Sequence, residues 1–173
     1  MINIISKNLS YILLYIVAIL LQVFVIDSKN LFGVTPSIIV AVVIVSSLLN
    51  DIKISTIYNL LMGLFLDFLY KNEFGIYTLG FVIISVIIGF INKNYRKESK
   101  LSLIYITFLG TCIFEIYKYL VYTIILSSTI SIFFLIFQII ISFILNVVIT
   151  FIIYNVFFKI HDITEIEKEY TLR

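Results

Sequence analysis

The chain has 173 residues, of which 62% are hydrophobic and 13% are charged, and its formal net charge at pH 7 is +2. Soluble domains usually carry about 25% charged residues, so this chain lacks the polar surface that a soluble domain needs. Its mean hydropathy of +1.17 points the same way. These values predict an integral membrane protein, exclude a soluble catalytic domain, and give no reason to expect nucleic acid as a partner.

Polar residues divide the sequence into six apolar segments of 17 to 29 residues, and one membrane-spanning helix needs roughly 20. The connecting segments are short, so sequential helices are expected to form antiparallel hairpins. The predicted fold is an all-α integral membrane protein, a bundle of six transmembrane helices that makes one domain of residues 1–173. The predicted spans are 9–26, 31–49, 54–70, 74–91, 101–126 and 130–158, and a short tail follows at 159–173.

The basic residues predict the orientation, because lysine and arginine in short loops stay on the cytoplasmic side of a membrane. Six spans place both termini on one side, and most basic residues fall on that side. Both termini are therefore expected to be cytoplasmic. The cytoplasmic set is Lys7, Lys53, Lys93, Arg96, Lys97, Lys100, Lys159, Lys168 and Arg173; the opposite side receives Lys29 and Lys71.

The third segment carries an acid, Asp67, near its end. Asn59, Gly63 and Asp67 are spaced by four residues and so share one helical face, which should point inward. Gly63 would let a neighbouring helix approach closely. A carboxylate within a bilayer is costly, and three interpretations remain open: Asp67 reaches interfacial water, it has a structural or partner-contact role, or it transfers protons or ions.

Further polar residues lie within the last two segments. Glu115 and Lys118 are three residues apart, which predicts an ion pair within one helix; the alternative is that they line a polar cleft or contact the span of another protein. The sixth segment carries a polar residue every four positions, which predicts a face packed against protein. These residues are Gln138, Ser142, Asn146, Thr150 and Tyr154.

No pattern in the sequence indicates catalysis. The single histidine, His161, lies in the tail, and the single cysteine, Cys112, lies in a span. No zinc motif, phosphate-binding loop or serine-nucleophile motif occurs. The chain is therefore expected not to be an enzyme and to need no cofactor or metal.

The segment from Gly63 to Gly80 resembles the MreD family of rod shape-determining membrane proteins. In that family a proline opens the second span, a Gly-Leu-x-x-Asp motif ends the third, and a glycine opens the fourth. The corresponding residues here are Pro36, Gly63, Leu64, Asp67 and Gly75. The chain length, the six spans and the long last segment agree with the family, whereas the Glu115–Lys118 pair is not part of its motif.

The resemblance implies a non-enzymatic membrane component of the machinery that elongates the bacterial cell wall. Such a protein would lie in the cytoplasmic membrane, contact membrane lipid, bind the single-span protein MreC, and connect indirectly to MreB, RodA and a class B penicillin-binding protein. The alternative is a substrate-binding membrane subunit of an energy-coupling-factor vitamin transporter, which also has six helices and resembles MreD-type chains in topology. Those subunits carry an Ala-x-x-x-Ala pattern in the first span, where this chain has Ala18 alone.

Overall fold

A computed structural model of the chain describes residues 13, 15–22, 37–70, 75–92, 100–124 and 131–171. Five helices occupy most of these ranges: α2 (Ile38–Leu49), α3 (Ile52–Leu69), α4 (Ile76–Asn92), α5 (Lys100–Ile124) and α6 (Ile132–Thr171). Residues 15–21 form a further helical stretch ahead of them. The prediction of an all-helical protein is thus confirmed for the part of the chain that the structure describes.

Three of the helices contain a stretch that is long and apolar enough to cross a membrane, namely α3, α5 and α6. Helices α2 and α4 are apolar but shorter. Helix α2 begins at Ile38, later than the predicted start at residue 31, and residues 31–36 lie outside the described ranges. The predicted span 9–26 is described only at residues 13 and 15–22. The helices therefore support a multi-pass membrane protein with three to five candidate spans.

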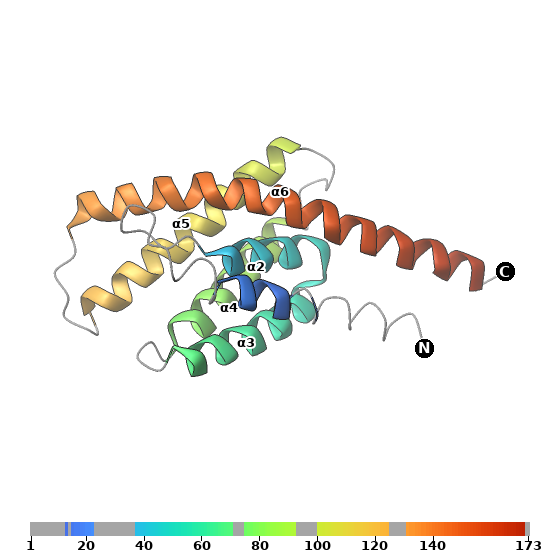
Figure 1. Ribbon diagram of the computed structural model, residues 1–173, viewed down its shortest axis with the longest axis horizontal. Coiled ribbons are helices and arrows are strands. Elements are labelled where there is room, and N and C mark those ends of the chain that lie inside the picture. The colour runs from blue at the N-terminus through green and yellow to red at the C-terminus, as the bar shows by residue number, and fades with distance from the viewer. Residues whose placement is uncertain are drawn as a thin grey trace.

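Helix α2 lies at the centre of the molecule (Figure 1) and contacts α3, α4, α5 and α6. Every residue from Ile39 to Leu49 is buried. This helix is apolar on all sides, apart from Ser46 and Ser47, and a helix of that kind has no face suited to water. Asn50 and Asp51 then separate α2 from α3, and the chain turns back.

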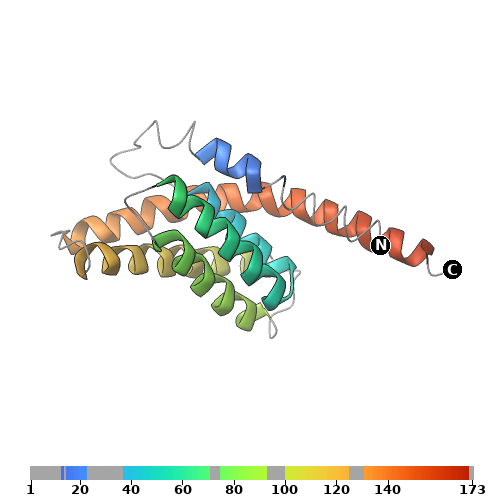
Figure 2. The same ribbon diagram turned by 90° about the horizontal axis from the view of Figure 1, so that it is seen from below.

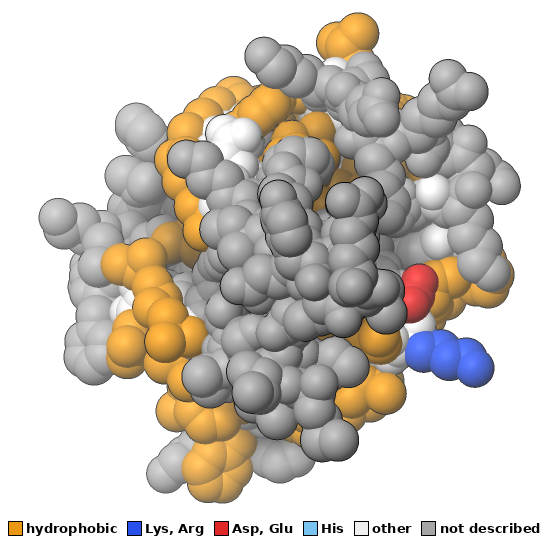
Figure 3. Space-filling model, turned by 90° about the vertical axis from the view of Figure 1, so that its right-hand side faces the viewer, with side chains coloured by type: hydrophobic (Ala, Val, Ile, Leu, Met, Phe, Trp, Pro, Cys, Tyr) orange, Lys and Arg blue, Asp and Glu red, His pale blue; other side chains and the backbone are white. Residues whose placement is uncertain are grey.

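The other helices form two antiparallel pairs, α3 with α4 and α5 with α6 (Figures 1 and 2). We call the end of the bundle where α3 ends and α4 begins the Asp67 end. Helix α6 has 40 residues and projects beyond the bundle at the opposite end. Seen from that side (Figure 3), the described side chains are mostly apolar, and acidic and basic side chains lie at the edge.

Candidate functional site

Asp67 lies in the last turn of α3, and its side chain is only 1% exposed. Its carboxylate accepts hydrogen bonds from the backbone N–H groups of Gly75 (3.0 Å), Tyr77 (2.9 Å) and Thr78 (3.1 Å), and from the Thr78 hydroxyl. The first N–H groups of a helix have no partner within that helix, and a negative charge there is favoured by the helix dipole. The end of α3 therefore supplies the N-terminal cap of α4.

Gly63 lies one turn before Asp67 and is also buried against α4. A Cβ atom on this residue would lie 2.4 Å from Thr78 Cα and 2.7 Å from Thr78 N. These are backbone atoms, which cannot rotate away as a side chain can. Gly63 thus permits the close approach of α4, and Asp67 binds the same residue of α4 that Gly63 contacts.

Gly75 begins the turn into α4 with a φ angle of +89°, a conformation that favours glycine. Its N–H binds Asp67, and its carbonyl accepts the backbone N–H of Leu79 (3.1 Å) and the Tyr117 hydroxyl (3.3 Å). Of the two remaining residues of the family motif, the structure describes only Leu64, which makes none of the hydrogen bonds of this network. Leu64 is 48% exposed on the outer side of α3, and Pro36 lies outside the described residues.

Asn59, the third member of the inward face of α3, is a buried junction between helices. Its side-chain oxygen accepts hydrogen bonds from the hydroxyls of Tyr15 and Ser46. Its amide donates to the hydroxyls of Ser47 (3.1 Å) and Ser85 (2.6 Å). Four helical segments therefore meet at one fully satisfied amide, which specifies how they pack.

Glu115 is directed to α6. Its carboxylate accepts hydrogen bonds from Gln138 Nε2 (2.8 Å) and Ser142 Oγ (2.9 Å). One turn away, Asn146 Nδ2 donates to Thr111 Oγ1 (3.2 Å). Gln138, Ser142 and Asn146 thus face α5, whereas the spacing predicted only a face packed against protein.

The ion pair expected between Glu115 and Lys118 is not formed in the described part of the chain. Lys118 influences Glu115 electrostatically, but the direct partners of the carboxylate are Gln138 and Ser142. Two uncharged donors from another helix hold the acid without requiring a long, mobile lysine side chain to adopt one geometry.

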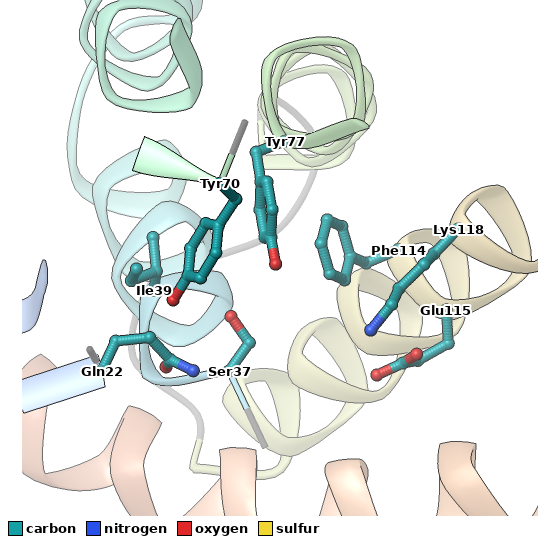
Figure 4. A pocket seen from close by; sticks show the side chains of 8 residues that line it. All are labelled: Gln22, Ser37, Ile39, Tyr70, Tyr77, Phe114, Glu115 and Lys118. Carbon is teal, nitrogen blue, oxygen red and sulfur yellow. The ribbon is translucent and has the colours of Figure 1, made fainter. Parts of the chain in front are cut away.

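Lys118 instead lines a small pocket at the Asp67 end (Figure 4), which we call the Lys118 pocket. The centre of a water molecule can occupy about 20 Å³ within it, which is room for about one water. Pockets for small organic ligands measure roughly 300–1,000 Å³. The pocket residues are Gln22, Ser37, Ile39, Tyr70, Tyr77, Phe114, Glu115 and Lys118.

Several of these contacts could not be read from residue patterns. The backbone donors of Tyr77 and Thr78 carry no side-chain signal, and Ser46, Ser47 and Ser85 look like ordinary small residues of apolar helices. Among the described residues, no group of three or more histidine, cysteine or acidic side chains is placed to hold a metal ion. The arrangement joins helices and does not assemble reactive groups.

Comparison with known protein families matches residues 3–160 to the family described as rod shape-determining protein MreD. No curated protein and no solved structure matches the chain, so the expected resemblance to substrate-binding subunits of energy-coupling-factor transporters has no support. The family match covers most of the chain and includes the Gly63–Asp67 segment, whose residues join α3 to α4. The chain therefore belongs to the MreD family of non-enzymatic, rod shape-determining membrane proteins.

Proposed function

We propose that this chain is a membrane adaptor of the cell-wall elongation machinery that binds an MreC-like single-span protein. Through that partner it connects to MreB, RodA and a class B penicillin-binding protein. Family membership supports a role in rod shape. In this proposal the chain is one six-helix domain of the bacterial cytoplasmic membrane, with both termini in the cytoplasm.

The observation that carries the proposal is the cap that Asp67 places on α4. A carboxylate bound by four donors from Gly75, Tyr77 and Thr78 holds the start of α4 against the end of α3. Partner recognition within lipid depends on helices that present a defined surface, because no hydrophobic force distinguishes one helix from another there. Asp67 thus orders the surface that the Asp67 end offers to a single-span partner.

The test is Asp67→Asn, which preserves the shape of the side chain but replaces one acceptor oxygen by an NH₂ donor. The amide is cheaper to bury than the ion, so the protein should remain in the membrane at its usual level. Recovery of MreC with the purified protein should fall, and cells that depend on the variant should become rounder.

The matched control is Asp51→Asn, because Asp51 is exposed, precedes α3 and makes no side-chain cap hydrogen bond. This variant should retain MreC and rod shape. Normal MreC recovery together with normal morphology in Asp67→Asn would refute the adaptor role of Asp67. Loss of vitamin uptake without a change of shape would instead support the transporter interpretation.

A further inference from the structure

Tyr117 connects α5 to the turn between α3 and α4. Its hydroxyl donates a hydrogen bond to the carbonyl of Gly75 (3.3 Å). The N–H of Gly75 binds the Asp67 carboxylate (3.0 Å), and its carbonyl also accepts the backbone N–H of Leu79 (3.1 Å). Hydrogen bonds from α3, α4 and α5 therefore meet at Gly75, and Tyr117 contributes the bond from α5.

The ring of Tyr117 packs against α4 at Gly80, which is buried. A Cβ atom on Gly80 would lie 3.2 Å from Tyr117 Cδ1 and 3.0 Å from Phe114 Cε2. Carbon atoms in favourable contact are about 3.5–4.0 Å apart, so even a methyl group at this position would press on both rings. Phe114 and Tyr117 are three residues apart and share one face of α5. Gly80 thus allows that face to lie directly on α4.

Phe114 belongs to a cluster of aromatic rings from three helices. Figure 4 shows it beside Tyr77 and Tyr70. Its ring centroid lies 6.0 Å from that of Tyr77 and 5.6 Å from that of Phe81, and Tyr77 stacks on Tyr70 at 5.4 Å. Burial of such rings holds α5 near α4 but is not directional. The Tyr117 hydroxyl, in contrast, binds one particular atom of the turn, which fixes where α5 lies against it.

The position of α5 affects the outer surface of the Asp67 end. Helix α4 exposes Leu79, which precedes Gly80, and α5 exposes Ile116 and Leu120 on either side of Tyr117 in the sequence. A shift of α5 along α4 would displace these exposed side chains relative to one another. Helices associate in lipid through close packing, so such a shift would change how well a partner helix fits.

We propose that Tyr117 is a positioning residue for the partner surface of the Asp67 end. It ties α5 to the cap that Asp67 places on α4, and Gly80 allows its ring to come close enough to do so. The inference rests on the proposed function, because the surface concerned is the one that an MreC-like single-span protein would contact.

The experiment compares the affinity of Tyr117→Phe and Tyr105→Phe for MreC, measured by titration of the full-length protein in lipid nanodiscs. Tyr117→Phe keeps the ring and removes only the hydroxyl. The matched control, Tyr105→Phe, makes the same change at an exposed tyrosine of the same helix. Tyr117→Phe should lower the affinity about threefold, the size of effect expected for one neutral hydrogen bond. Tyr105→Phe should bind like the unmodified protein, and both variants should be present in the membrane at the same level.

The double variant Asp67→Asn with Tyr117→Phe tests whether Tyr117 acts through the cap. Both changes affect the bonds of Gly75, so the double variant should bind MreC about as weakly as Asp67→Asn alone. Losses that multiply would show that Tyr117 acts independently of the cap and would overturn the proposal. Gly80→Ala keeps the hydroxyl but presses on the ring, and it should lower the affinity at least as much as Tyr117→Phe.

The same measurements separate this inference from the proposed function. Weak binding by Asp67→Asn together with normal binding by Tyr117→Phe would overturn the role of Tyr117 and leave the adaptor role of the chain in place. Normal binding by both variants would overturn the two proposals together. An equal loss in Tyr117→Phe and Tyr105→Phe would also overturn the role of Tyr117, because the exposed hydroxyl makes no contact with the turn.

Discussion

Asp67 and Thr78 are joined twice, because the carboxylate accepts both the backbone N–H (3.1 Å) and the hydroxyl of the threonine. Asp67 ends one helix and Thr78 lies in the first turn of the next. An N-cap usually comes from the residue just before its helix, whereas this cap comes from the preceding helix. The buried carboxylate of Asp67 consequently holds the start of α4 against the end of α3.

Asp67→Asn should loosen the first turn of α4 without unfolding the bundle. Loss of a cap costs about 1 kcal/mol, so amide exchange at Tyr77 and Thr78 should become several-fold faster. Exchange near Ile84, which is fully buried, should not change. Hydrogen–deuterium exchange with mass spectrometry can measure both regions, and Asp51→Asn serves as the control. Equal acceleration throughout α4 would show that the carboxylate supports the whole bundle.

Gly63→Ala should lower the free energy of unfolding by about 3 kcal/mol, the upper part of the range for overpacking, because its Cβ would press on the backbone of Thr78. Gly75→Ala is the matched comparison: a Cβ there meets nothing within 4 Å, but φ is +89°. The conformational penalty alone is about 1 kcal/mol. Equilibrium unfolding in mixed micelles can rank the two, and a larger loss at Gly75 would contradict the close approach of α3 and α4.

Glu115 and Ser142 should be energetically coupled. A double-mutant cycle of Glu115→Ala and Ser142→Ala should give a coupling of about 1 kcal/mol, within the range found for hydrogen bonds between membrane helices. Pairing Glu115→Ala with Ser85→Ala should give none, since Ser85 binds Asn59. A coupling of Glu115 to Lys118 that exceeds its coupling to Ser142 would restore the ion pair as the main contact of the acid.

The predicted topology can be tested with single cysteines in a Cys112→Ser background. Ser99→Cys and Thr171→Cys lie on the side rich in lysine and arginine, so an impermeant thiol reagent should not label them in intact cells. Ser28→Cys lies in the opposite set of loops and should be labelled. Labelling of Ser99→Cys from outside would refute cytoplasmic termini.

The inward face of α3, formed by Asn59, Gly63 and Asp67, shows what the spacing of residues can predict. An interval of four residues indicates a shared face, and all three residues lie buried on α3. The partners of that face could not be derived in the same way. Asp67 binds mainly backbone N–H groups, which every residue but proline carries, so the sequence does not mark which ones it binds.

Glu115 shows where spacing misleads. A lysine three residues away offers a local partner, yet the donors that bind the acid come from α6, 23 and 27 residues along the chain. Local spacing shows which contacts one helix permits, whereas packing between helices decides which are made. The resemblance to the MreD family required only short motifs in the sequence, and the family match over residues 3–160 confirms it.

Helix α6 is long and continuous, so a small change in its tilt moves its far end over a large distance. Its 40 residues extend about 60 Å, roughly twice the thickness of the hydrocarbon layer. The residues after Val156, the end of its apolar stretch, account for about 22 Å of that length. The buried part is held to α5 by Glu115 and Thr111. A change of about 10° in the tilt of α6 about the residues that Glu115 and Thr111 bind would move its far end, about 44 Å away, through roughly 8 Å. A small adjustment in the bilayer would thus become a larger displacement outside it.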